Sequence, residues 1–307
     1  MTFSPDLRDR FRGALLGLAV GEALGAPAEF LSAAQVVERY GFIAEMIGGG
    51  IHDVAPGQTT DATDMALCLA ESLAERGDHD PEDVMHRYRA WFESRPCDVS
   101  LTVRTAMLSY AAGTPWDLAS RRAYEILGHP VAGNGSLMRC APLALRFHED
   151  GSRRRVAMED ESTLTHFDRL AGWACVAYGD LLAAALHGRL AEALPSIADG
   201  LDDEDRRVGA ALREAVEAEP AEVRNSAFVV DSLRTALWAV LRSETFEEAV
   251  CLVVNLGDDA DTVGAITGAL AGAAHGEAGI PARWLAPLEL RERLRAVADR
   301  LADLAGA

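Results

Sequence analysis

The pattern of apolar and polar residues predicts helices along the whole chain. In residues 6–25, for example, Phe11, Leu15 and Leu18 recur at three- and four-residue spacing, which is typical of one face of a helix. Alternating runs long enough for a strand do not occur, and neither does an internal repeat or a low-complexity linker. We therefore expect an all-α fold and a single compact multi-helix domain over residues 1–307. The segments with helical periodicity are residues 6–25, 33–40, 65–73, 81–127 in several pieces, 137–145, 161–190, 191–219, 222–250, 262–273 and a terminal stretch to about 304.

One of these helices is unusually rich in small residues. Gly264, Gly268 and Gly272 recur every four residues in the apolar segment after Asp261. Glycine costs up to about 1 kcal/mol relative to alanine inside a helix, so this spacing indicates close approach to a second helix. The same spacing marks transmembrane dimers, but the apolar run ends at His275 and is too short to cross a hydrocarbon core of about 30 Å.

Composition narrows the class of protein. With 307 residues, of which 49% are hydrophobic, the chain can bury a substantial core, and its net charge of -19 argues against a broad surface for nucleic acid or anionic membranes. The N-terminus shows no secretory cleavage pattern and no span long enough for a membrane helix, so we expect a cytoplasmic protein.

The cysteines are odd in number, widely spaced and without a CxxC pair, which favours reduced core residues: Cys68, Cys97, Cys140, Cys175 and Cys251.

An acidic loop at residues 255–262 stands directly before the small-residue helix. Asp259, Asp261 and Thr262 offer several oxygen ligands within a few residues, and Gly257 frees the turn. Carboxylates placed so close to a buried segment indicate a hard divalent cation, because oxygen ligands suit Mg²⁺ and Mn²⁺. The plainer interpretation is that Asp261 or Thr262 caps the helix.

A second loop repeats this chemistry about two hundred residues earlier. Thr60 and Asp61 precede the amphipathic helix that includes Met65 to Leu73. A single capping residue explains one such loop well enough. Two loops of this kind could also face each other across one site, and we state that arrangement as a hypothesis.

Three further candidates carry weaker signals. Glu29 lies on a loop between apolar neighbours and is most simply a solvated acid, and His166 is most simply a capping or packing residue. A glycine-rich loop entering an apolar element could present backbone N–H groups to a phosphate, but on this motif alone a plain turn is the favoured interpretation. The loop consists of Gly133, Asn134, Gly135 and Ser136.

Taken together, these stretches resemble the ADP-ribosylglycohydrolase family, which includes the dinitrogenase reductase-activating glycohydrolases. Their order along the chain matches the family order and covers residues 12–284. The matching pieces are Arg12 to Gly17 with Gly25 to Glu29, Thr60 to Thr63 with Met65 to Leu67, Gly133 to Ser136 with Met138 and Arg139, Thr165 and His166 with Ala177 and Tyr178, Asn255 to Thr262, and Ile280 and Pro281 with Trp284.

The resemblance implies a binuclear metal cleft that holds two Mg²⁺ (or Mn²⁺) ions and hydrolysis of the glycosidic bond between ADP-ribose and a target. By position, the metal ligands would be Thr60, Asp61, Asp259, Asp261 and Thr262. Glu29 matches an acid with a catalytic or gating role. Asp61 also matches a catalytic position of the family. Gly133, Asn134, Gly135 and Ser136 would line the diphosphate and ribose, with His166 beside the ligand.

One residue departs from the family pattern in a way that bears on activity. The family loop usually reads Thr-Asp-Asp-Thr, whereas Ala62 occupies the second Asp position here. A carboxylate that would bind metal or position water is therefore absent, and we expect turnover to be impaired more than ADP-ribose binding. The change is either natural or introduced, and the intact remainder of the set favours an introduced one. Glu22 stands where many members have Asp.

The sequence thus favours an ADP-ribosylglycohydrolase that reverses ADP-ribosylation, with an arginine side chain as the preferred target. The expected partners are ADP-ribose or an ADP-ribosylated protein, with nucleic acid less favoured and no membrane, and we expect a monomer. Two alternatives remain open: a non-catalytic ADP-ribose-binding module, which Ala62 favours, and a structural relative without metal or ligand.

Overall fold

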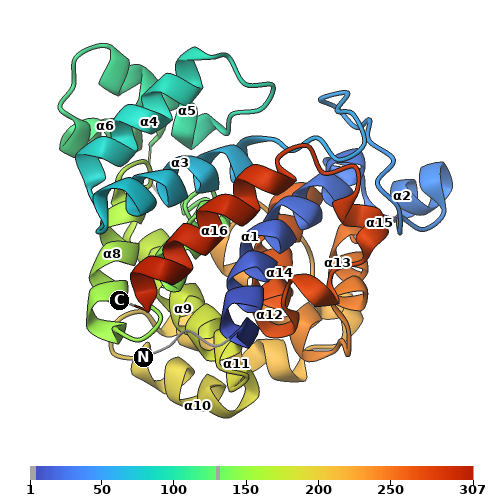
Figure 1. Cartoon of the computed structure of the whole chain (residues 1–307). Helices are drawn as coiled ribbons and strands as arrows, with labels where there is room; N and C mark the ends of the chain where they lie inside the picture. The colour runs from blue at the N-terminus through green and yellow to red at the C-terminus, as the bar shows by residue number, and fades with distance from the viewer. Residues whose placement is uncertain (1–4, 129–131, 307) are drawn as a thin grey trace.

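The computed structural model describes residues 5–128 and 132–306, and it is all-α as expected (Figure 1). Within those residues it contains sixteen α-helices and isolated β-bridges but no named strand. The α-helices are α1 (Pro5–Gly25), α2 (Ala33–Tyr40), α3 (Asp61–Arg76), α4 (Pro81–Glu93), α5 (Leu101–Ala111), α6 (Ala119–Leu127), α7 (Ala141–Arg146), α8 (Gly151–Thr163), α9 (Arg169–Leu186), α10 (Leu190–Gly200), α11 (Arg206–Glu217), α12 (Val229–Leu241), α13 (Phe246–Val254), α14 (Ala260–His275), α15 (Ala282–Leu285) and α16 (Arg291–Ala305). Short 3₁₀ turns include η1 (Ala26–Ala28) and η3 (Leu137–Arg139).

Several predicted helices are each broken into two, and in two of them a capping side chain begins the second helix after a short polar segment. Residues 191–219 form α10 and α11, and the side chain of Asp205 accepts a hydrogen bond from Arg207 N at the start of α11. Residues 222–250 form α12 and α13, and Thr245 caps α13 in a capping box. The terminal stretch likewise divides into α15 and α16.

The predicted close approach of two helices is found between α1 and α14, which lie side by side in the middle of the molecule (Figure 1). Their glycines meet in pairs. A Cβ placed on Gly268 would lie 1.9 Å from the carbonyl oxygen of Gly17, and one on Gly264 would lie 2.4 Å from that of Gly21. Only residues without side chains permit this backbone contact, so the glycines of the acidic-loop helix are explained by packing.

Helix α9 packs against α14 and belongs to the buried core. Tyr178 in α9 donates a hydrogen bond to Ile266 O in α14 at 2.7 Å. By length and mean hydropathy alone, Arg169–Leu186 could cross a membrane. However, 83% of this segment is buried inside the protein, as in the core helix of a globular domain.

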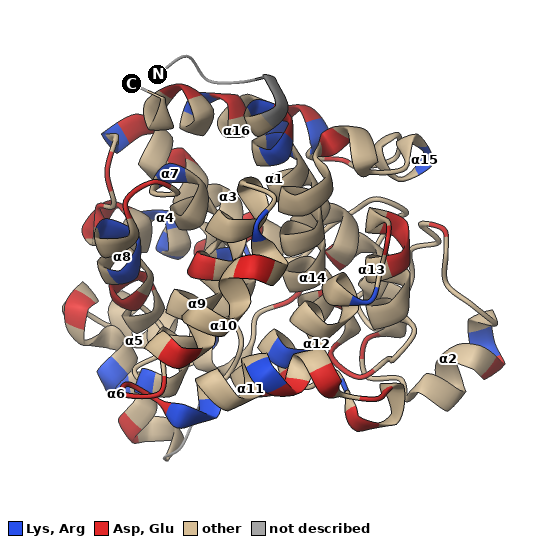
Figure 2. Cartoon of the chain, turned by 90° about the horizontal axis from the view of Figure 1, so that it is seen from below, with Lys and Arg blue, Asp and Glu red and all other residues tan. Residues whose placement is uncertain are grey.

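Charged residues lie mainly on the outer helices. Acidic and basic residues are interspersed along peripheral helices such as α11 and α16 (Figure 2). All 29 basic residues are arginines, since the sequence contains no lysine. Many of them pair with carboxylates across helices, as Arg12 does with Asp299 at 2.7 Å and Arg293 with Glu71 at 2.6 Å.

The five cysteines are all free, in agreement with the prediction that they form no disulfides. Cys140, Cys175 and Cys251 are buried, and Cys68 is half-buried. Cys97 is exposed and was wrongly assigned to the core, because it lies in the loop between α4 and α5 instead of in an apolar helix.

Candidate active site

The N-terminal ends of α3 and α14 border the same cavity, as the two-loop hypothesis predicts. The cavity has a volume of about 520 Å³ and combines carboxylates with a few apolar side chains. Predicted site residues that line it are Glu29, Asp61, Asn134, Gly135, Asp259 and Thr262, joined by Phe30, Asp98, Ser100, Leu101, Met138 and Arg224. Segments separated by about two hundred residues are therefore brought to one site.

At the start of α3, the cap comes from a neighbouring helix and not from the loop itself. Glu22 of α1 is 1% exposed, and its Oε1 accepts hydrogen bonds from Thr60 Oγ1 at 2.9 Å and from Ala62 N at 2.8 Å. Its Oε2 accepts from the amide and hydroxyl of Thr63. Thr60 makes no side-chain cap bond, so its oxygen and the Asp61 carboxylate are not consumed in capping. Ala62 is buried beside them.

At the start of α14, the acidic loop turns sharply. Gly257 and Asp258 both have positive φ, +73° and +51°, which Gly tolerates best and Asp tolerates moderately. The side chain of Asp259 makes no cap bond, while Asp261 Oδ1 accepts a hydrogen bond from Thr262 N at 2.8 Å. Asp261 and Thr262 are 2% and 8% exposed, so the loop carries acids into a buried position.

Backbone pairing fixes the loop of Glu29 against this acidic turn. Phe30 N donates to Asp258 O at 2.7 Å, and Asp258 N donates to Leu31 O at 2.6 Å. Ser32 and Gly257 form an antiparallel bridge next to these bonds. Glu29 is thereby held 7% exposed at the cavity wall, which rules out a fully solvated loop acid.

The buried carboxylates of the cavity raise each other's pKa. Burial, followed by the charges of Asp98 and Asp259, raises the pKa of Glu29 to about 8. Burial and neighbouring carboxylates also hold the pKa of Asp61 and of Asp261 well above the usual range for an aspartate. The charged neighbours that shift these three acids most are all carboxylates. Without a cation, the site would retain protons at neutral pH.

This donor set fits hard divalent cations. The oxygens come from carboxylates and hydroxyls, and Glu29 Oε2 is a buried atom without a hydrogen-bond partner. Among the described residues, the three potential ligands gathered within 4.8 Å of one another at this cavity are Glu29, His52 and Asp98. The Nε2 atom of His52 lies 3.2 Å from Glu29 Oε2 and 3.7 Å from Asp98 Oδ1.

The glycine-rich loop approaches the cavity through Asn134 and Gly135. Asn134 Nδ2 donates to Asp259 Oδ2 at 2.7 Å and to Ser232 Oγ at 2.9 Å, so the loop is joined directly to the acidic turn. Ser136 points the other way: it is 0% exposed, and its hydroxyl hydrogen-bonds with Ser162.

His166 lies behind the glycine loop. It is 2% exposed, and a Cβ placed on Gly135 would approach its Cε1 to 3.0 Å. Burial lowers the pKa of His166 to about 3, so its imidazole is neutral near pH 7. Gly133 forms a bridge with Phe228 on the far side of the same loop. The structure therefore places Gly133, Ser136 and His166 as supports of the loop, away from the cavity surface.

Sequence reasoning missed Asp98, Ser100 and His52. Asp98 and His52 lie on irregular loops with no periodicity or motif to mark them. Ser100 begins α5 and offers its backbone N–H to Asp61, and a Ser directly before an apolar run was an available signal for that helix start. These residues reach the site only through the tertiary fold.

Known proteins resemble this chain along nearly its full length. The family model described as ADP-ribosylglycohydrolase matches residues 4–307. The chain is 35% identical to the ADP-ribosyl-[dinitrogen reductase] glycohydrolase of Rhodospirillum rubrum, with 98% of each chain covered. It is 32% identical to an ADP-ribosylarginine hydrolase of Serratia proteamaculans, covering 95% of this chain and 79% of that protein.

A solved structure described as an ADP-ribosylglycohydrolase-related protein complex superposes with a TM-score of 0.83 and 40% identity, covering 98% of this chain and 100% of the other. The family model spans nearly the full chain, and the named relatives are hydrolases of glycosyl bonds. The chain belongs to the ADP-ribosylglycohydrolase family of glycosyl-bond hydrolases.

Proposed function

We propose that this protein hydrolyses the glycosidic bond that joins ADP-ribose to a protein side chain, with arginine as the preferred target and two Mg²⁺ or Mn²⁺ ions as cofactors. The observation that carries the proposal is the group of buried carboxylates at the shared N-terminal ends of α3 and α14. We further propose that it acts as a cytoplasmic monomer.

The metal ions would be held by Thr60, Asp61, Asp259, Asp261 and Thr262. When bound, they would supply positive charge that keeps these carboxylates ionised and orients the ribose diol. The protein residues supply the remaining chemistry. Asn134 fixes the Asp259 carboxylate through its amide, and Gly135 lies at the cavity wall where a sugar or phosphate would bind.

Glu29 is the residue suited to assist the attacking water. Glu29 lines the cavity, with its Oε2 buried 3.2 Å from His52 Nε2, so its carboxylate can accept a proton from a water in the cavity. Ionisation of Glu29 requires its raised pKa to fall, which nearby cations would favour. The departing guanidine would leave protonated, and the acidic surroundings of the cavity stabilise that cation.

The charge of the molecule supports an arginine-linked substrate over a nucleic acid. The net charge of -19 disfavours the approach of a polyanion. Arg224 lines the cavity, but its guanidinium is paired with Asp231 at 3.2 Å, which reduces its attraction for phosphates of a second molecule.

The decisive experiment compares Ala62→Asp with Ala62→Asn, because the two variants have side chains of nearly equal size and differ in charge. ADP-ribose release is measured from arginine-, serine- and nucleobase-linked substrates with Mg²⁺ present. We expect Ala62→Asp to exceed the unmodified chain by about 10²-fold or more, the range of general acid–base assistance, while Ala62→Asn does not. Preferential cleavage of the nucleobase linkage would contradict the charge argument, and equal rates in all three proteins would contradict the proposed role of position 62.

Ala62 also supports a second candidate, a module that binds ADP-ribose without hydrolysis. Calorimetry separates the two. ADP-ribose affinity in the presence of Mg²⁺, combined with no turnover even in Ala62→Asp, would favour the binding module over the enzyme.

A further inference from the structure

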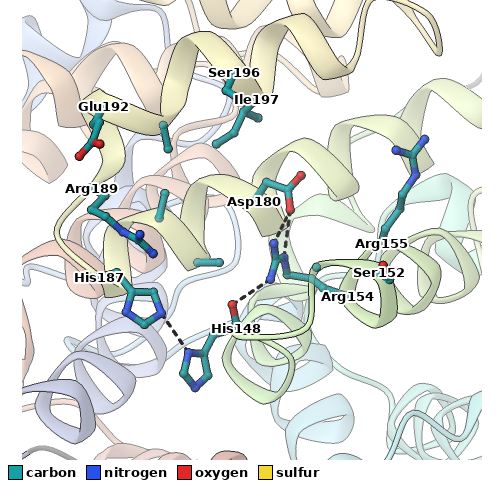
Figure 3. Close-up of a pocket in the computed structure, with 14 residues that line it drawn as sticks. His148, Ser152, Arg154, Arg155, Asp180, His187, Arg189, Glu192, Ser196 and Ile197 are labelled. Atoms are coloured by element: carbon teal, nitrogen blue, oxygen red, sulfur yellow. Dashed lines mark hydrogen bonds and ion pairs between the residues drawn. The ribbon is translucent and has the colours of Figure 1, made fainter.

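A second group of metal-ligating side chains lies outside the active-site cavity. It borders a separate surface cavity of about 700 Å³ between α8, α9 and α10, and none of the residues lining that cavity lines the other (Figure 3). His148 lies in the loop between α7 and α8, and His187 lies directly after the last residue of α9. The side chain of Glu149 completes the group.

The three potential ligand atoms form a nearly regular triangle. His148 Nδ1 lies 3.2 Å from His187 Nε2 and 3.5 Å from Glu149 Oε1, and His187 Nε2 lies 3.3 Å from the same Oε1. In a tetrahedral zinc site with Zn–N and Zn–O distances of about 2.0–2.1 Å, neighbouring ligand atoms are separated by about 3.3 Å. The triangle therefore has the size of one face of a zinc coordination tetrahedron.

The chemistry of these three ligand atoms also favours a bound cation. Two imidazole nitrogens and a carboxylate oxygen face one another, and each nitrogen offers a lone pair in the tautomer that carries its proton on the other ring nitrogen. One N–H between the histidines can satisfy one edge of the triangle, but a single ion would satisfy all three edges.

The surrounding side chains hold the first histidine in place. Arg154 donates to the backbone oxygens of Phe147 and His148 at 2.9 and 3.0 Å, and Figure 3 shows its ion pair with Asp180 of α9, at 2.6 Å. Phe11 packs edge-on against the His148 ring, with centroids 5.5 Å apart. Asp180 balances the charge of Arg154, so this arginine does not oppose a cation as a free charge would.

We propose that His148, His187 and Glu149 form a binding site for one zinc ion, with a fourth coordination position open toward the adjoining cavity. Two imidazole ligands distinguish this site from the active site, where the proposed metal ligands Thr60, Asp61, Asp259, Asp261 and Thr262 all offer oxygen, since nitrogen donors favour zinc over Mg²⁺. The ion would join the end of α9 to the loop before α8. Arg155, Arg189 and Ser152 line the cavity that the fourth position faces, so water or a small anion can complete the coordination.

The test measures zinc binding and not hydrolysis. Metal-free protein carrying Cys97→Ser, so that the exposed thiol cannot take the ion, is titrated with Zn²⁺ against a chromophoric chelator in excess Mg²⁺. His187→Ala and Glu149→Gln are compared with His86→Ala, a matched control at an exposed histidine outside the group. Asp259→Asn serves as a second control, because it alters the active-site cavity alone.

We expect one zinc ion per chain, bound at least about 10-fold more weakly after His187→Ala and unaffected by His86→Ala or Asp259→Asn. Glu149→Gln should weaken binding less, because this side chain is 69% exposed. Co²⁺ in place of zinc should give the intense visible absorption of a four-coordinate site, and this absorption should disappear in His187→Ala. Circular dichroism checks that each variant is folded. Equal zinc affinity in His187→Ala and the parent, or zinc binding that is lost only in Asp259→Asn, would overturn the proposal.

Discussion

Asp259 connects the predicted metal site with the glycine-rich loop, because its Oδ2 accepts the hydrogen bond from Asn134. If Asp259 binds a cation, Mg²⁺ or Mn²⁺ should stabilise the native state, by about 2.7 kcal/mol when the ion exceeds its Kd 100-fold. Asp259→Asn preserves a hydrogen-bond acceptor and removes the charge, so we expect most of the metal-dependent rise in melting temperature to vanish.

The matched control for this prediction is the adjacent Asp258→Asn. Asp258 is exposed and has φ of +51°, a conformation that Asn accepts readily, so the substitution should not disturb the turn. Differential scanning calorimetry with and without metal measures both variants. A full metal response in Asp259→Asn would place the ions elsewhere.

The buried His166 should make the stability of the protein depend on pH. Its folded pKa of about 3 lies below the value of about 6.5 in an unfolded chain. The neutral ring therefore contributes its full stability above pH 6.5, and that stability is lost as pH falls toward 3, because only the unfolded state takes up the proton. Between pH 7 and pH 5 this amounts to about 2 kcal/mol.

His166→Gln removes the titrating group and retains polarity, so we expect its free energy of unfolding to fall less than that of the parent between pH 7 and pH 5. Urea denaturation at both values provides the measurement. His79 and His148 also have lowered pKa values, so part of the pH dependence should remain. His86→Gln, at an exposed site, should keep the parental slope, and the same slope in His166→Gln would refute the prediction.

At the scale of elements, the contact between α1 and α14 sets the position of the acidic turn. Gly268→Ala would place a Cβ 1.9 Å from Gly17 O, inside van der Waals contact with backbone that cannot move aside easily. We expect a loss of about 2 kcal/mol or more in the free energy of unfolding, although alanine is the better helix former.

Gly172 in α9 supplies the control, because a Cβ there would meet no atom within 4 Å. Gly172→Ala should be neutral or stabilise by about 0.5–1 kcal/mol through the helix propensity of alanine. Chemical denaturation compares the two variants directly. Equal stability of Gly268→Ala and Gly172→Ala would show that the two helices can separate at little cost.

At the scale of the whole molecule, a buried ion pair joins three distant segments. Arg139 of η3 and Glu161 of α8 are both 0% exposed, and their Nε and Oε1 atoms lie 2.7 Å apart. Tyr88 of α4 donates to the same Oε1 at 2.8 Å. Arg139→Met would leave Glu161 buried without its counter-charge, at an expected cost of about 3–5 kcal/mol.

A double-mutant cycle tests this pair. Arg139→Met combined with Glu161→Leu removes both charges and should cost less than the sum of the two single changes. Arg89→Met breaks an exposed pair with Glu93 at 2.8 Å and should change stability by less than about 1 kcal/mol. Arg139→Met behaving like Arg89→Met would mean that the buried pair is unimportant for the fold.

The sequence alone determined the fold class, the close helix contact and the two acidic loops. Helical periodicity is a local property, and the glycines at four-residue spacing in 264–272 require a near neighbour whatever the topology. Asp259 and Thr60 could also be identified as candidate ligands from the sequence, because a carboxylate or hydroxyl directly beside an apolar helix is visible in the order of residues. The helix breaks after 200 and 241 were missed, although the polar segments 202–207 and 242–245, with their capping residues Asp205 and Thr245, mark both of them in the sequence.

Only the tertiary structure decided which side chains reach the site. It brought Glu29 out of solvent by pairing its loop with Asp258, and it supplied the cap of α3 from Glu22, nearly forty residues away in sequence. It turned Ser136 into the core, and it gathered His148 and His187 at the second cavity. Such placements depend on contacts between segments that are distant in the sequence. Burial in those contacts changes the hydrogen bonds and the pKa values of the side chains, and neither effect produces a periodic pattern in the sequence.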